Sequence, residues 1–215
     1  MWVSPSHQDT EFHQPLSLEN KMTIFEDRTK GWKLDIADQV INGKNQADGS
    51  IERSPIPNSG YATLDIIFSY FEMIAKYEAG FAKMGQSEKF FKQGVFLVFP
   101  ALRDPQLLAN IPAIHGDVAL LVSSTLDVMY EGIRCGLYHS GITNGPVMLT
   151  SEIRQAIGID PQETVIIINP HLLVKALKEH FAGYMTDLGN PNKQLLRQNF
   201  EARFDFDSRG GLQIA

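Results

Sequence analysis

One arginine and one histidine near the middle of this 215-residue chain have the side chains needed to cleave a phosphodiester. Arg134 and His139 lie in the segment YEGIRCGLYHSG. An imidazole can move a proton to or from a ribose hydroxyl near neutral pH, and a guanidinium can hold phosphate oxygens and stabilise developing charge. This chemistry needs no metal ion and no other cofactor. Tyr138 and Ser140, on either side of the histidine, are candidates for positioning the substrate.

The two residues lie near the end of a predicted helix of about 20 residues. Five positions on a regular helix correspond to about 140° of net rotation, so their side chains would not share a narrow face. They converge only if the helix ends or loosens between them, which Gly136 and the stop at Gly141 favour. The simpler interpretation is that His139 caps its own helix and that Arg134 forms a surface salt bridge, for example with Glu131.

A long helix followed by arginine, a short linker and His-Ser-Gly resembles the C-terminal motif of the HEPN superfamily (higher eukaryotes and prokaryotes nucleotide-binding). The resemblance is best over residues 61–141. HEPN domains are α-helical bundles that are usually dimeric, and their catalytic members form a composite ribonuclease cleft from two protomers. The resemblance therefore implies a homodimeric, metal-independent endoribonuclease in which Arg134 binds phosphate and His139 is the general acid or base. It also implies RNA as a partner, and a toxin–antitoxin or antiviral role with an antitoxin-like protein.

Two alternatives stay open. Cys135 stands where HEPN proteins often have a polar residue directly after the arginine, and the net charge is −6. Both features favour a noncatalytic, HEPN-like dimeric module for interaction or nucleotide binding. A third hypothesis is a sensor of a small ligand or nucleotide built on residues 147–150 and 164–169. His171, in the first turn of a predicted helix, could contact a phosphate or a metal, but a solvated residue is the simpler interpretation.

The composition excludes several classes of protein. With 43% hydrophobic and 20% charged residues, the chain is expected to fold rather than to stay disordered. Its single cysteine excludes an internal disulfide framework and a cysteine-rich zinc site. The acidic balance argues against broad binding to nucleic acid, so no DNA partner is expected. No apolar run of about 20 residues and no basic export signal appear, so we expect a cytoplasmic protein without a membrane partner.

The hydrophobic spacing predicts a mainly α fold, a helical bundle with a small two-stranded β insertion near residues 146–169. We expect an N-terminal arm at 1–20, a single HEPN-like helical domain at 21–206 and a C-terminal tail at 207–215. Within the domain, residues 44–60 read as a polar loop, and the cap-plus-proline pairs Asp104-Pro105, Asn169-Pro170 and Asn190-Pro191 are helix starts. Helices are predicted at 21–43 with a break near Gly31, and at 61–82, 87–97, 117–138, 151–158, 170–187 and 191–204.

Overall fold

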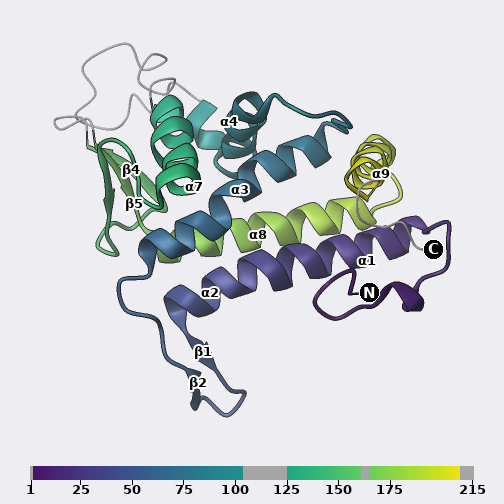
Figure 1. Cartoon of the computed structure of the whole chain (residues 1–215), viewed down its shortest axis with the longest axis horizontal. Coiled ribbons are helices and arrows are strands. Elements are labelled where there is room, and N and C mark those ends of the chain that lie inside the picture. Colours follow the sequence, from purple (N-terminus) through teal and green to yellow (C-terminus); the bar gives the residue numbers. More distant parts are fainter. Residues whose placement is uncertain (1, 104–124, 161–164, 209–215) are drawn as a thin grey trace.

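The fold is a bundle of helices with a small β-sheet at one end (Figure 1). The structure is a computed structural model that describes residues 2–103, 125–160 and 165–208. The predicted class, mainly α with a small β insertion, is confirmed. Within the described ranges, no helix has the length and apolar character needed to cross a bilayer. The predicted helix start at Asp104-Pro105 and the predicted helical residues 117–124 lie outside these ranges.

The first long helix is continuous and consists of α1 (Leu18–Thr29), the π-helical segment η2 (Lys30–Leu34) and α2 (Asp35–Asn42). The predicted break near Gly31 is wrong, because the helix continues through this residue in a widened turn. A Cβ atom at Gly31 would lie 2.6 Å from Cγ of Pro5. The glycine therefore allows the N-terminal segment to pack closely on the helix rather than interrupting it.

The N-terminal segment folds back along α1. Val3 is buried, and its carbonyl accepts a hydrogen bond from Nε of Arg28 at 2.6 Å. The carboxylate of Asp27 accepts from the backbone and the hydroxyl of Ser6. A single 3-10 turn, η1 (Asp9–Glu11), follows before α1 begins.

The predicted polar loop at 44–60 contains a small antiparallel hairpin of β1 (Lys44–Asn45) and β2 (Ile51–Arg53). The hairpin projects from the end of α2, away from the bundle (Figure 1). Gly43, with φ of 75°, ends α2 and turns the chain into the first strand.

The core is centred on α3 (Gly60–Glu78) and α4 (Ser87–Val98), followed by the 3-10 turn η3 (Pro100–Arg103). The rings of Phe71 and Phe91 are fully buried, with their centroids 5.5 Å apart in an edge-to-face arrangement. Two buried rings fix how α3 and α4 face each other. Their packing confirms the helices predicted at 61–82 and 87–97, although α3 ends earlier than expected.

Close approach of backbones explains both the tight contact of α3 with α4 and the early end of α3. A Cβ atom at Gly94 would lie 1.8 Å from the carbonyl oxygen of Phe71, so only glycine fits there. Gly80 has φ of 61°, and a Cβ atom there would lie 2.7 Å from Oδ1 of Asn199 on the last helix, α9 (Gln194–Ser208). The chain therefore leaves the helix where α9 crosses it.

The sheet has three strands rather than the predicted two, in the order β3 (Val147–Leu149), β5 (Val165–Ile168), β4 (Ile157–Asp160). β3 runs parallel to β5, which confirms the predicted pairing, and β4 adds antiparallel to the other edge of β5. The predicted helix at 151–158 is wrong. The side-chain amide of Asn169 donates to the carbonyls of Ser151 and Ile153, which hold the segment in bends before β4.

Two helices complete the bundle, α8 (Pro170–Gly189) and α9 (Gln194–Ser208). Asn169 caps α8 by accepting from the first-turn amides, and proline occupies its first position, as expected from the sequence. The predicted start of the last helix at residue 191 is wrong. Oδ1 of Asn190 accepts from the amide of Asn192, so a turn comes first. α9 also continues to Ser208, into the predicted tail.

Candidate functional site

The candidate residues lie on one helical stretch that begins at residue 125 within the described ranges. It passes through the π-helical segment η4 (Val128–Cys135) into α7 (Gly136–Ser140). Gly141, with φ of 68°, ends α7, and its amide donates to the carbonyl of Leu137. The helix is therefore loosened up to Cys135 and regular from Gly136 onward. Insertions of this type are frequent at functional sites.

The loosened helix frees a backbone carbonyl that holds the following loop. The amide of Asn144 donates to the carbonyl of Gly132 at 2.6 Å. Cβ atoms at Gly132 and Gly136 would lie 2.2 Å from the carbonyl oxygen of Asn144 and 2.8 Å from that of Ile142. Residues 142–144 thus fold back directly onto the backbone that carries the arginine and the histidine, and both glycines are needed for this contact.

Arg134 reaches from η4 to α3. Its Nη2 atom lies 3.2 Å from Oε2 of Glu72, and a quarter of its side chain, 25%, stays exposed. The partner is thus Glu72 and not Glu131, which the simpler interpretation of the sequence suggested. The guanidinium carbon also lies 5.5 Å from the centre of the Tyr138 ring, which is within cation–π range.

Glu72 is the centre of a polar cluster inside an otherwise apolar contact between α3, α4 and η4. Its Oε1 atom accepts from Nζ of Lys76 at 2.5 Å and from the hydroxyl of Ser87 at 2.8 Å. Burial alone would raise the pKa of Glu72. The hydrogen bonds from Lys76 and Ser87 and the charges of Lys76 and Arg134 outweigh it and hold this pKa below its ordinary value. Two cations around one carboxylate leave a net positive charge.

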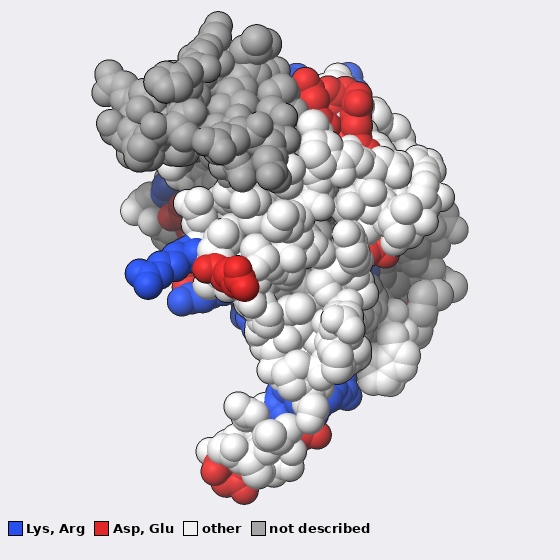
Figure 2. All heavy atoms as spheres, turned by 90° about the vertical axis from the view of Figure 1, so that its left-hand side faces the viewer, with Lys and Arg blue, Asp and Glu red and all other residues white. Residues whose placement is uncertain are grey.

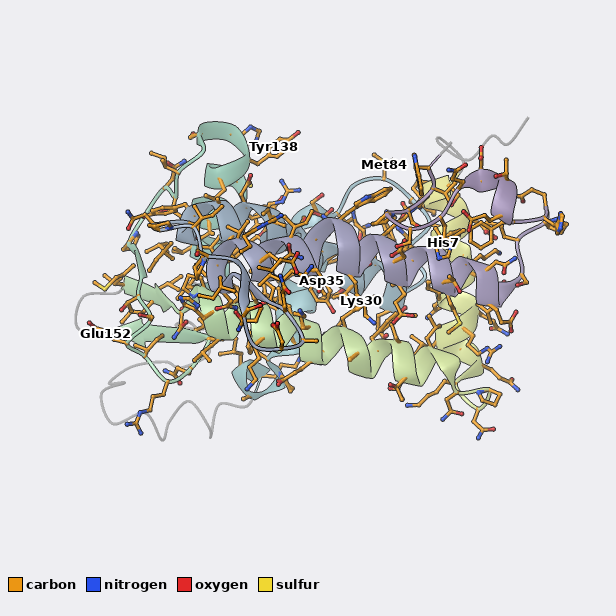
Figure 3. The ribbon with its side chains drawn as sticks, turned by 90° about the horizontal axis from the view of Figure 1, so that it is seen from below. His7, Lys30, Asp35, Met84, Tyr138 and Glu152 are labelled. Atoms are coloured by element: carbon orange, nitrogen blue, oxygen red, sulfur yellow. The ribbon has the colours of Figure 1, made fainter. Side chains whose placement is uncertain are left out.

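Tyr138, His139 and Ser140 are exposed at the end of α7. Tyr138 is 73% exposed and lies at the outer edge of the molecule (Figure 3). Its ring meets the His139 imidazole edge-on at 5.0 Å, so the tyrosine contacts both the guanidinium and the imidazole. No hydrogen bond joins Arg134 directly to His139 in the described part of the chain. The helix therefore gathers the two side chains around one aromatic ring, with the imidazole open to solvent.

Glu72, Lys76 and Ser87 were missed by the sequence analysis. A signal was present, because Glu72 and Lys76 form a charged pair four positions apart within an apolar helix stripe. Gln86 occupies the N-cap position of α4, so the hydroxyl of Ser87 does not cap the helix and bonds to Glu72 instead. A buried ion pair on a core helix is unusual enough to indicate a partner from elsewhere in the chain.

Two further histidines lie on α8, away from the arginine. His171 Nδ1 lies 2.6 Å from Oδ1 of Asn42, and His180 Nδ1 lies 2.8 Å from the hydroxyl of Tyr70. Burial lowers the pKa of His180 below its ordinary value. No group of three or more His, Cys, Asp or Glu side chains within the described ranges is arranged to hold a metal ion.

No protein-family model matches the chain, and no curated protein and no solved structure is significantly similar to it. A tethered guanidinium can bind an anionic group, an exposed imidazole can transfer a proton, and an exposed aromatic ring between them can stack on a flat group.

Proposed function

We propose that this protein is a cytoplasmic, metal-independent endoribonuclease of HEPN type that acts as a homodimer. His139 is the general acid or base, and Arg134 binds the phosphate of the scissile bond. The observation that supports this most strongly is the geometry around Tyr138, whose ring contacts both the Arg134 guanidinium and the His139 imidazole. Tyr138 and Ser140 line the approach to the phosphate.

The chemistry follows from the groups present. An imidazole removes the proton of a ribose 2′-hydroxyl, whose oxygen then attacks the phosphorus. The bond from phosphorus to the 5′-oxygen breaks, and that oxygen receives a proton from a general acid. The products are a 2′,3′-cyclic phosphate and a 5′-hydroxyl. The guanidinium of Arg134 stabilises the negative charge that develops on the phosphate oxygens during the attack.

The cluster around Glu72 supports phosphate binding despite the acidic net charge. Lys76 and Arg134 share the single carboxylate of Glu72, so the cluster carries an excess of positive charge. A guanidinium held on one side by a carboxylate loses little rotamer freedom when phosphate binds on its open side. Glu72 therefore acts as a positioning residue for Arg134 in this proposal.

A second copy of the chain supplies the second proton-transfer group that one copy of the site lacks. One imidazole cannot be both base and acid in the same step, whereas two copies of His139 can divide these roles. The exposed apolar side chains of Tyr138 and Ile142, next to the site, favour the approach of a partner surface. An antitoxin-like protein could cover the same surface in a toxin–antitoxin or antiviral system.

The alternative is a noncatalytic dimeric module for interaction or nucleotide binding. One specific observation favours it: Glu72 already neutralises much of the Arg134 charge, and the arginine is followed by Cys135 where HEPN proteins often have a polar residue. In this case Arg134 stabilises the contact of η4 with α3, and His139 has no chemical role.

The test compares RNA cleavage by the wild-type protein and by Arg134→Ala and His139→Ala in buffer containing a chelator. Matched controls are Arg154→Ala and His13→Ala, which remove the same side chains from exposed positions elsewhere. We expect the two site variants to lose at least about a hundredfold in rate, as is typical for the loss of a proton-transfer group, and the controls to keep the wild-type rate. Equal rates in all five proteins would exclude the catalytic assignment and leave the interaction module.

A further inference from the structure

A cleft lies on the face of the molecule where α2 ends and where α3 and α8 begin, beside the sheet. It has a volume of about 560 Å³, which is within the usual range for small-molecule sites. In Figure 2, the described part of this face is mostly uncharged, with charged side chains at its edges. Its walls come from the end of α2, residues 56–61, residues 149–152 and the start of α8. None of these residues belongs to the Arg134 site.

His171 lines this cleft, and its contacts determine which ring nitrogen can accept a hydrogen bond. Asp38 is ionised: burial opposes this, but hydrogen bonds from Lys178 and Asn42 and the charge of Lys178 hold the pKa of Asp38 below its ordinary value. A carboxylate can only accept hydrogen bonds, so the Asn42 atom that lies 2.7 Å from it must be the amide nitrogen, which donates. The amide oxygen of Asn42 therefore faces Nδ1 of His171 at 2.6 Å, and Nδ1 carries the hydrogen. In the neutral imidazole, Nε2 is then left as an acceptor.

The other polar groups of the cleft add to this pattern. The Ser59 hydroxyl is buried and donates to the carbonyl of Val40, so it offers only acceptor lone pairs to a ligand. The Thr150 hydroxyl accepts from the amide of Glu152, so its own hydrogen is free to donate. The polar wall thus suits a ligand that carries several N–H or O–H groups.

The apolar and charged side chains of the lining further limit the class of ligand that fits the cleft. Ile56 and Tyr61 are large side chains that remain about half exposed at the cleft, so they provide a surface for a flat ring. Among the residues that the structure describes, Glu152 is the only charged one in the lining, and its side chain projects outward at the edge of the molecule (Figure 3). Because the described part of the lining contains no lysine or arginine, a phosphorylated ligand would meet the negative charge of Glu152 without a cation to compensate.

We propose that this cleft binds a nucleoside. The flat base lies against Ile56 and Tyr61, and an N–H or O–H group of the ligand donates to Nε2 of His171. The proposal is independent of RNA cleavage at Arg134 and His139, since the two sites share no residue.

The experiment measures binding of adenosine, guanosine, cytidine and uridine to the full-length protein by calorimetry, with adenosine 5′-monophosphate as a phosphorylated probe. His171→Ala removes the acceptor, and Tyr61→Ala removes the ring surface, so one variant remains informative if the other fails to fold. Lys175→Ala is the matched control, because this residue is exposed on the same helix as His171 and does not line the cleft.

We expect at least one nucleoside to bind with a dissociation constant below about 1 mM, and each cleft variant to weaken its binding about tenfold. Lys175→Ala should bind as the wild type does, and the 5′-phosphate should weaken binding. The absence of binding by all four nucleosides to the wild type would overturn the proposal. So would unchanged affinity in both cleft variants, or tighter binding of the monophosphate than of adenosine.

Discussion

Oε2 of Glu72 on α3 lies 3.2 Å from Nη2 of Arg134 on η4, although the two residues are 62 positions apart. This contact joins the proposed phosphate-binding arginine to the centre of the bundle. Since Lys76 and Ser87 bond to the other carboxylate oxygen, one side chain links α3, α4 and η4. The Glu72 cluster should therefore affect both the stability of the bundle and the pH dependence of that stability, and these two effects can be measured separately.

The Glu72→Gln variant should be strongly destabilised. It leaves Lys76, which is only 10% exposed, without a counter-ion, and breaking a buried ion pair typically costs about 3–5 kcal/mol. The free energy of unfolding in urea measures this cost. The control is Glu52→Gln in the hairpin, where both partners of the Lys44–Glu52 pair are over 40% exposed and about 0–1 kcal/mol is expected. Equal losses in the two variants would show that the Glu72 cluster does not stabilise the bundle.

The same carboxylate should make stability depend on pH at the acidic end. Because the pKa of Glu72 is lowered by folding, the unfolded chain binds more protons there, and stability falls as the pH drops below the ordinary value of 4.5. The difference in free energy of unfolding between wild type and Glu72→Gln should therefore be largest at neutral pH and shrink below that value. A difference that stays constant from neutral to acidic pH would contradict this account of the cluster.

His180 should make the stability of the protein depend on pH in a second, higher pH range than Glu72 does. Burial lowers its pKa, so the unfolded chain binds the proton first, and stability should fall as the pH drops below the ordinary value of 6.5. Denaturant unfolding measured between pH 7.5 and pH 5 tests this. In His180→Gln, which keeps a polar partner for the Tyr70 hydroxyl but does not titrate, the decline should be smaller. The idea fails if the two proteins lose stability in parallel over this range.

Gly132→Ala should disrupt the loop that packs on η4. The added Cβ atom would lie 2.2 Å from the carbonyl oxygen of Asn144, and forcing such a contact typically costs about 1–3 kcal/mol. Gly183→Ala, in the middle of α8 with open space around it, should instead gain about 0.5–1 kcal/mol. Thermal unfolding of both variants gives the comparison. We expect the two substitutions to change the free energy of unfolding in opposite directions. A Gly132→Ala variant more stable than the wild type would show that the loop packs differently.

Tyr138 should act in RNA cleavage through its ring rather than its hydroxyl. Its ring contacts both the guanidinium of Arg134 and the imidazole of His139. Tyr138→Phe keeps this ring and should retain nearly the wild-type rate. Tyr138→Ala removes a contact of about 1 kcal/mol and should slow cleavage about fivefold to tenfold. A loss in Tyr138→Phe as large as in Tyr138→Ala would assign the role to the hydroxyl instead.

Much of the fold could be predicted from local patterns. The apolar spacing that predicts α3 and the Asn169-Pro170 signal that predicts α8 both reflect local chemistry, and the structure confirms them. The predictions that were wrong depend on contacts between residues far apart in the sequence. Gly31 allows Pro5 to pack closely on a helix that continues through it. In the segment predicted to be helical before β4, the carbonyls of Ser151 and Ile153 instead accept from the side chain of Asn169.

The candidate site was only partly predictable for the same reason. Arg134 and His139 are close in sequence, so their motif could be recognised. The loosened segment η4 ends at Cys135, however, and the helix is regular from Gly136 to Ser140, so the opening expected between the two residues is confined to the arginine side. Glu72, in contrast, meets the arginine only through the packing of α3 on η4. Its pairing with Lys76 indicated a partner but not which one, because a single sequence does not specify contacts between distant helices.

The most direct test of the central proposal is the chemical nature of the RNA ends produced in the presence of a chelator. With the wild-type protein, we expect fragments that end in a 2′,3′-cyclic phosphate, and with His139→Ala we expect uncleaved RNA under the same conditions. Intact RNA with the wild-type protein, or the same cyclic ends with His139→Ala, would contradict the assignment of His139 as the proton-transfer group.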